Sequence, residues 1–247
     1  MHLNKLVLAL SLAALALPMS VMAQDAAPAD APAAEAPASN LSWNFSLTSD
    51  YVFRGITQTD FKPAAQGGLD YSFGDSGWAI GAWGSNVDFG TGSPDIEVDT
   101  YIGWSHALSD KWNFNILLDR YNYLGESQSF GNIDFNELIG KVTYNDMITF
   151  TAAYSDNWAQ GGYSETYFNV SGHWSVGNDC KINAGVGRSN FSDNVGSYTD
   201  WNLGISHQFG PVNAALNYYD TNGDFVDSIY GNHKASDSIV LSFAFGG

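Results

Sequence analysis

The sequence contains few basic residues, a single cysteine and no long apolar run after its N-terminal segment. Each shortage excludes a partner or a kind of structure. Only 9 of its 247 residues are Lys or Arg, against 26 Asp or Glu, so the net charge is −17. Nucleic acid is therefore excluded as a partner, because binding it requires a cationic face. The single cysteine, Cys180, cannot form an internal disulfide, so backbone hydrogen bonds and packing must hold the fold together.

Charged residues are also scarce, at 14%, whereas aromatic residues reach 15% and glycine occurs 26 times. Ordinary soluble domains contain about 25% charged residues. Long helices are rich in Ala, Leu, Glu and Lys. The composition therefore argues against an all-helical or coiled-coil protein.

The N-terminal segment has the order of a secretory signal peptide. Lys5 precedes an apolar run, Leu6–Leu17, and Val21–Ala23 supplies the small residues of a cleavage site. The run is shorter than the roughly 20 residues that a membrane-spanning helix needs. We expect residues 1–23 to be removed on export, and the Ala- and Pro-rich residues 24–40 to form a flexible tail without a fold.

From residue 41 onward, apolar and polar residues alternate with the period of two that is typical of half-buried strands. In 41–48, for example, Leu, Trp, Phe and Leu alternate with Ser, Asn, Ser and Thr. Each segment is close to the roughly 9–11 residues that a tilted membrane strand needs. We expect about twelve strands, at 41–54, 63–74, 78–89, 95–107, 111–123, 132–144, 147–157, 163–175, 180–191, 198–209, 212–221 and 235–245.

The connections between these segments alternate in length. Tight turns near 74–77, 108–110, 145–146, 176–179 and 210–211 alternate with mostly longer loops at 55–62, 90–94, 124–131, 158–162, 192–197 and 222–234. Outer-membrane barrels have short periplasmic turns and longer extracellular loops, whereas a β-sandwich has no reason to sort its loops this way. The sequence therefore predicts an all-β transmembrane antiparallel barrel over 41–247, located in the outer membrane. The longest loop, 222–234, is the expected plug or gate.

Aromatic residues gather near both ends of the predicted strands, as expected for the two girdles of such a barrel. The short-turn set is Trp43, Phe73, Trp112, Tyr144, Trp174 and Phe209. The long-loop set is Tyr51, Phe53, Phe89, Tyr121, Tyr123, Phe191, Tyr198 and Tyr218.

Carboxylates dominate the positions that strand parity places inside the barrel. We expect the pore to be lined by Asp50, Glu97, Asp99, Asp119, Glu137, Glu165 and Asp200, with Asp70 and Asp88 also facing inward. A vestibule of one sign concentrates cations and repels anions. The alternative is that these carboxylates are merely solvated or hydrogen-bonded, as polar barrel interiors often are.

Arg120 and Arg188 interrupt the apolar face near the long-loop end. A charge is costly on the lipid face at mid-membrane but inexpensive at the interface. We expect these two arginines to contact lipopolysaccharide phosphates in the outer leaflet. The alternative is that they extend along the apolar surface to reach water.

The segment Ser49–Thr59, SDYVFRGITQT, resembles the TorF-type porin family. The likeness continues through Lys62–Ala64 and Gln66–Tyr71, and the remaining strands are compatible with it. The resemblance implies an outer-membrane barrel and a porin. It implies no substrate and no functional residues.

Passive diffusion of small solutes or ions, with a weak preference for cations, is the function that these features predict. We expect no catalytic residues, no metal ligands and no cofactor, and the sequence specifies no oligomeric state. One alternative is a closed barrel with a structural or surface-interaction role. Another is a lipid hydrolase using His173 and Ser175, whose spacing places both on one strand face. Parity puts that pair inward and near a short turn, far from the outer rim.

Overall fold

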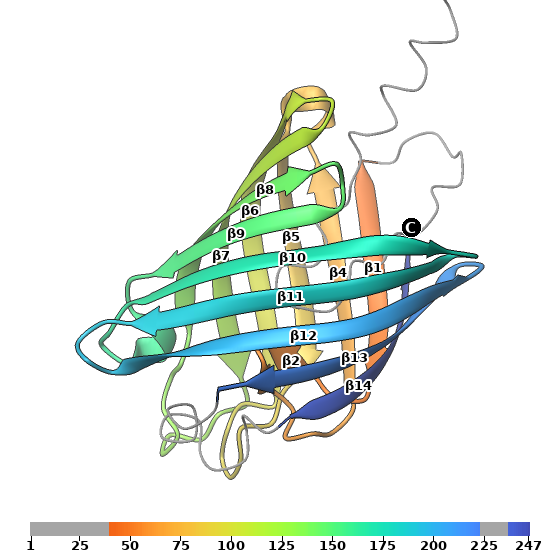
Figure 1. The fold of residues 1–247 in the computed structure, drawn as a ribbon. Helices are drawn as coiled ribbons and strands as arrows, with labels where there is room; N and C mark the ends of the chain where they lie inside the picture. Colours follow the sequence, from red (N-terminus) through yellow and green to blue (C-terminus); the bar gives the residue numbers. More distant parts are fainter. Residues whose placement is uncertain (1–39, 223–236) are drawn as a thin grey trace, which may run out of the picture.

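A computed structural model describes residues 40–222 and 237–247. These residues form a closed antiparallel barrel of twelve strands (Figure 1), which confirms the predicted fold class. The expectations for residues 1–23, residues 24–39 and the loop residues 223–234 concern positions outside the described ranges.

The wall strands follow one another around the barrel in chain order. They are β1 (Leu41–Thr48), β4 (Ala64–Ser72), β5 (Trp78–Asn86), β6 (Ile96–Ser109), β7 (Trp112–Leu124), β8 (Phe135–Tyr144), β9 (Ile148–Ser155), β10 (Glu165–Gly177), β11 (Cys180–Phe191), β12 (Gly196–Phe209), β13 (Val212–Thr221) and β14 (Ser238–Gly246). Two short strands, β2 (Val52–Phe53) and β3 (Ile56–Thr57), form a separate sheet, and the short 3-10 helices are η1 (Gly74–Ser76) and η2 (Trp158–Gln160).

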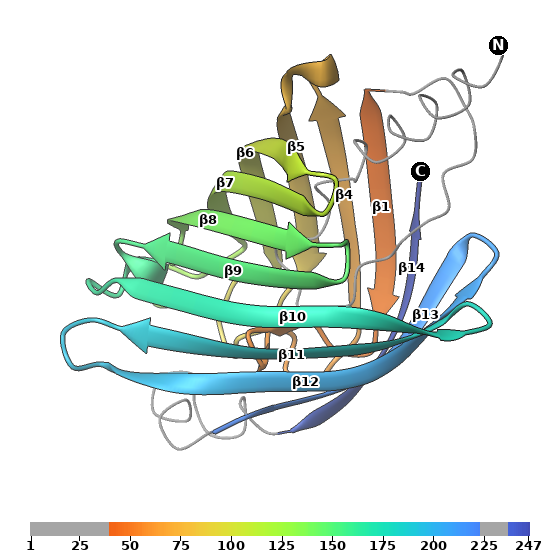
Figure 2. The same cartoon turned by 45° about the horizontal axis from the view of Figure 1, so that its top comes forward.

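The barrel closes where the first and last strands meet. β1 pairs with β14 from Asn44↔Gly246 to Thr48↔Ser242 and with β4 on its other side. The Trp43 N–H donates to the Gly247 carbonyl at 2.8 Å, which extends the pairing to the last residue. In Figure 2, β1 in orange and β14 in dark blue lie side by side. Closure satisfies the backbone groups that an open edge would expose to lipid.

Strand parity separates an apolar outer face from a polar inner one. Large apolar side chains such as Leu47, Phe150 and Leu203 point outward and are 46%, 46% and 53% exposed. Inward neighbours of opposite parity are polar, and Glu97 and Glu165 are each only 1% exposed. A continuous apolar belt around a polar interior is the surface that a lipid bilayer covers. Within the described ranges, no helix is long and apolar enough to cross a membrane.

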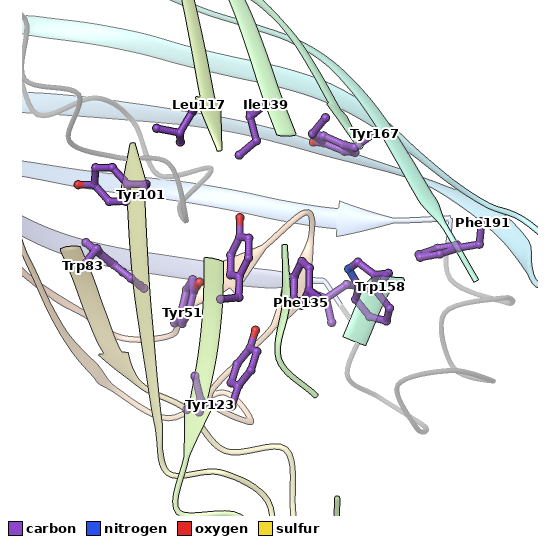
Figure 3. Close-up of a cluster of buried hydrophobic side chains, with 14 of the residues drawn as sticks. Tyr51, Trp83, Tyr101, Leu117, Tyr123, Phe135, Ile139, Trp158, Tyr167 and Phe191 are labelled. Carbon is purple, nitrogen blue, oxygen red and sulfur yellow. The ribbon is translucent and has the colours of Figure 1, made fainter. Parts of the chain in front are cut away.

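Most of the aromatic residues predicted to form a girdle at the long-loop end do not face outward, so that prediction is wrong for them. Tyr121, Tyr198 and Phe191 are 1%, 1% and 7% exposed and lie inside the barrel. Tyr121 follows the inward Asp119 by two residues, so parity turns both inward. These rings join a packed core in the lumen (Figure 3), in which Tyr121 stacks on Phe135 with ring centroids 4.3 Å apart. Packing in the interior therefore accounts for aromatics that the sequence alone assigns to a lipid interface.

The short-turn set does point outward. Trp43 and Phe209 are 50% and 60% exposed on the outer face. Tyr218, at the opposite end, lies outside as well and packs against Trp201 at 5.2 Å between ring centroids.

Because the apolar belt faces lipid, the free-energy cost of placing a charged side chain on it should depend on depth in the membrane. Leu203→Arg, at the middle of β12, should destabilise the barrel in lipid vesicles by about 2–4 kcal/mol. Phe209→Arg, at the end of the same strand, should cost only about 0–1 kcal/mol because its guanidinium reaches the interface. Denaturant titrations of the folded protein in vesicles measure both costs. Equal costs at the two positions would contradict the belt.

Candidate functional site

The segment 49–63 between β1 and β4 folds into the barrel as a hairpin. Val52 pairs with Thr57 and Phe53 with Ile56, across the two-residue turn Arg54–Gly55. The φ angles of the turn residues are +48° and +76°, the combination that a type I′ turn requires. The predicted strand 41–54 therefore ends earlier, at Thr48, and its last residues belong to this luminal hairpin.

The turn glycine of the hairpin packs against wall strands two and three places from β1 around the barrel. A Cβ on Gly55 would lie 2.5 Å from Cγ2 of Thr221 and 2.8 Å from Cβ of Asp200. These neighbours belong to β13 and β12, whereas the hairpin starts from β1. The Arg54 side chain reaches farther, to Glu137 on β8 and Glu165 on β10, each five strands from β1 around the wall. The segment therefore crosses the lumen.

Hydroxyl groups fix the base of the hairpin around Asp50. Thr57 and Thr59 donate to one carboxylate oxygen of Asp50 at 2.6 and 2.9 Å. The Thr48 hydroxyl donates to the Asp50 carbonyl at 2.7 Å. Asp50 was expected on a strand as a pore-lining carboxylate. It lies instead in the loop, where it holds the hairpin closed.

The guanidinium of Arg54 is the centre of the site. Its Nη2 lies 2.8 and 2.9 Å from the two carboxylate oxygens of Glu137, and its Nη1 lies 2.8 Å from Oε2 of Glu165. The side chain is 6% exposed and those of both glutamates 1%. The guanidinium carbon also lies 4.2 Å from the ring centroid of Tyr167 and 4.7 Å from that of Phe53. Charge-assisted hydrogen bonds to two carboxylates and cation–π contacts to two rings thus converge on one buried cation.

Burial acts to lower the pKa of Arg54, but the carboxylates of Glu137 and Glu165 outweigh it and raise the pKa above its ordinary value. The guanidinium therefore stays charged inside the barrel. Losing Arg54 would leave the two buried carboxylates without their counter-charge, which is strongly destabilising.

The other expected carboxylates also point into the lumen. Those on strands are each 1% exposed: Glu97, Asp99, Asp119, Glu137, Glu165 and Asp200. The Tyr51 hydroxyl donates to Glu97 at 3.1 Å and the Tyr167 hydroxyl to Asp200 at 3.2 Å. Asp99 and Asp119 differ, since no side chain in the described part of the chain donates a hydrogen bond to either carboxylate. The long-loop half of the interior therefore gathers carboxyl groups from several wall strands around Arg54.

Asp70 and Asp88 take different places. Asp70 faces inward and accepts a hydrogen bond from the Tyr101 hydroxyl at 2.7 Å. Asp88 lies in the loop after β5 rather than on a strand, and its carboxylate accepts a 2.6 Å bond from Nζ of Lys62. The Asp88 N–H also donates to the Gln58 carbonyl at 2.8 Å. Asp88 therefore ties this loop to the hairpin segment.

The short-turn half of the interior is less tightly filled. Many of its inward side chains are polar and half-buried: Asn113, Lys141, Thr143, Thr149, Thr151, Ser171, His173 and Lys181. Asn183, Ser206 and Asn213 in the same half are buried. The interior is thus packed at the long-loop end and looser at the other. His173 belongs to this half and Ser175 is exposed beside it, so neither lies at the outer rim.

Both expected surface arginines lie on the outer face near the long-loop end. Nη2 of Arg120 lies 3.1 Å from a carboxylate oxygen of Asp134. Arg188 donates to the hydroxyls of Thr199 and Ser197 and remains exposed. Hydroxyl partners leave the charge of Arg188 unneutralised, whereas Asp134 offsets that of Arg120.

The sequence-based reasoning missed Arg54 and its aromatic partner Tyr167. A signal was present, because Arg54–Gly55 is flanked by the strand-forming pairs Val52–Phe53 and Ile56–Thr57. The period-two alternation of 41–48 runs on through this segment, so the pattern predicts the end of one long strand there and hides the hairpin.

The architecture is that of a closed twelve-stranded antiparallel barrel with an apolar outer face, and solved structures share this fold. One similar structure is described as "Unveiling the Mechanism Behind the in-meso Crystallization of Membrane Proteins", with a TM-score of 0.54, 9% identity, and 84% of this chain and 83% of that chain covered. Another, "NanC porin structure in rhombohedral crystal form", has a TM-score of 0.48, 10% identity and coverage of 83% and 97%. A third, "KdgM porin in complex with disordered oligogalacturonate", has a TM-score of 0.45, 6% identity and coverage of 83% and 95%.

Residues 32–243 match the family described as "Bacterial protein of unknown function (Gcw_chp)", and the chain belongs to that family. The family description does not include the TorF-type name. No curated protein matches the chain in sequence.

The contact at the hairpin tip makes Gly55→Ala a sharp test. The new Cβ would collide with Thr221 and Asp200, so we expect the hairpin to leave the wall and trypsin to cleave after Arg54. Gly74→Ala is the matched control, because Gly74 also has a positive φ, +57°, but nothing lies within 4 Å of its Cβ position. The control should cost only about 1–2 kcal/mol of backbone strain and leave Arg54 protected. Mass spectrometry of the fragments and thermal unfolding distinguish the two. A Gly55→Ala barrel with Arg54 still protected would contradict the packed tip.

Proposed function

We propose that this protein is an outer-membrane channel for passive diffusion of small solutes, and that the hairpin of residues 49–63 forms its constriction. The proposal rests on one observation. The closed wall surrounds an interior rich in carboxyl groups, and a loop segment rather than the wall itself obstructs that interior. A loop can move while the wall keeps its hydrogen bonds, so the obstruction is compatible with passage. The resemblance of Ser49–Thr59 to the TorF-type porins supports the same reading.

Location follows from the belt and from the N-terminal segment. Removal of residues 1–23 on export would deliver the chain to the outer membrane, with residues 24–40 as a tail before the barrel. Lipopolysaccharide is the lipid partner that we propose, through Arg188 in the outer leaflet. Arg120 would contribute less, because Asp134 already neutralises it.

Cation preference is the second part of the proposal. The proposed pore-lining carboxylates are Glu97, Asp99, Asp119, Glu137, Glu165 and Asp200, with Asp50 holding the hairpin beside them. Arg54 offsets Glu137 and Glu165, which leaves Asp99 and its neighbours to set the sign of the potential. A negative lumen repels anions and concentrates cations.

A closed barrel with a structural or surface-interaction role is the second candidate. It is favoured by the aromatic core around Tyr51 and Tyr121, whose side chains are each 1% exposed. Catalysis is not proposed, because His173 and Ser175 lie away from the rim at which a lipid substrate would be presented.

Conductance separates the two candidates. We expect discrete single-channel steps from the refolded protein in a planar bilayer, and larger or longer openings from Arg54→Ala, because losing the ion pairs frees the hairpin. Arg120→Ala is the control, since it removes a rim arginine without touching the hairpin. A heat-modifiable, correctly folded barrel that shows no steps with or without Arg54 would favour the closed structural role.

Selectivity tests the carboxylates directly. Replacing Glu97, Asp99 and Asp119 together by Gln, Asn and Asn should move the reversal potential in a salt gradient toward zero, because the luminal potential loses its source. The matched control replaces Asp75, Asp110 and Asp146, which are exposed at the short turns, by Asn. It removes the same charge from outside the lumen. An equal change in the two triple variants would argue against a luminal origin of selectivity.

A further inference from the structure

The side chains that bind Arg54 form a site. Those that belong to the barrel wall keep their positions without the hairpin. Glu137 lies on β8, where it stands in register with Asp119, and its Oε2 accepts a hydrogen bond from the Tyr121 hydroxyl at 3.3 Å. Glu165 and Tyr167 lie on β10, paired along β9 and β11. The ladders of the barrel fix all of these side chains. Removing the Arg54 side chain would therefore leave two carboxylates and an aromatic face in place.

The hairpin that carries Arg54, by contrast, has little backbone pairing of its own. The sheet of β2 and β3 contains only the pairs Val52↔Thr57 and Phe53↔Ile56. An isolated two-stranded hairpin is at best marginally stable in water. Its position inside the barrel therefore depends on side-chain contacts with the wall, and the ion pairs of Arg54 are the charged ones among them.

We propose that Glu137, Glu165 and Tyr167 form a binding site for small organic cations with a guanidinium or primary ammonium group, and that Arg54 is the resident competitor for it. A solute that takes the place of Arg54 would release the hairpin and open its own path. That gating step rests on the proposed channel function, whereas the binding site stands on the geometry alone.

The chemistry of the site fits this solute class and rejects others. A planar guanidinium matches the two oxygens of Glu137 and can reach Glu165 with a second nitrogen, as Arg54 does. The face of Tyr167 adds a cation–π contact that a neutral solute would lack. An anion would meet the carboxylates of Glu137 and Glu165, which Arg54 already holds by its ion pairs.

A free cation competes with the tethered guanidinium of Arg54, and this competition sets the solute concentration needed to displace it. A group tethered by a short segment has an effective concentration of roughly millimolar or above. A free cation must exceed that value to displace Arg54. The proposal thus describes a channel that opens only when its solute is abundant.

Chemical rescue tests the site without any current. In Arg54→Ala, guanidinium or methylguanidinium at about millimolar concentrations should raise the unfolding temperature in detergent and saturate, while NaCl at equal ionic strength should not. Adding Glu165→Gln should weaken the apparent affinity about tenfold, the loss expected for one charged hydrogen bond. Arg120→Ala controls for general effects, because its lost ion pair lies on the exposed rim. Identical responses of the Arg54 and Arg120 variants would overturn the site.

The wild-type protein supplies a second measurement that holds even if Arg54→Ala fails to fold. Putrescine or methylguanidinium should accelerate chymotryptic cleavage after Phe53, because displacement of Arg54 exposes the hairpin. NaCl at the same ionic strength should leave the rate unchanged, and a rate insensitive to both cations would overturn the competition. Rescue without conductance would refute the channel but keep the cation site. Conductance without rescue would refute the cation site alone.

Discussion

Closure of the barrel by β1 and β14 is the constraint on which the rest of the structure depends. Once these strands pair, every wall strand has two neighbours and the backbone can lie in lipid without unsatisfied groups. Closure also divides space into two environments, so each residue belongs to one of them by its parity. The exposed Leu203 and the buried Asp200 on the same strand illustrate the division. The closed hydrogen-bond ladder therefore accounts for both the apolar outer belt and the interior lined by carboxyl groups.

A charged interior creates a physical problem that the hairpin partly solves. Asp119 and Glu137 stand directly opposite each other in the β7–β8 register, and like charges in that position destabilise a sheet. Arg54 neutralises Glu137 and binds Glu165 from the hairpin side. The same ion pairs that stabilise the wall therefore hold the obstruction in place. Stability and closure of the lumen are coupled through one guanidinium.

The wall could be predicted from the sequence because its signals are local. Alternation in 41–48 and 198–209, together with tight turns such as that at 210–211, is written in neighbouring residues. The inward direction of Glu97 and Glu165 followed from parity alone. Tyr121 was misplaced although it shares the parity of Asp119, because an aromatic near a strand end suits either a lipid interface or a packed interior. Only the position of other side chains decides between them.

What the sequence determined by itself was the barrel, its strand order and which side chains face inward, since these depend on periodicity and turn chemistry within a few residues. What the tertiary structure decided was the occupancy of the lumen. Arg54 meets Glu137 and Glu165 across 83 and 111 residues of chain. No local pattern encodes a contact between a loop tip and a distant wall. Whether the segment after Thr48 continues as a strand or turns inward depends on the free energy of those long-range ion pairs.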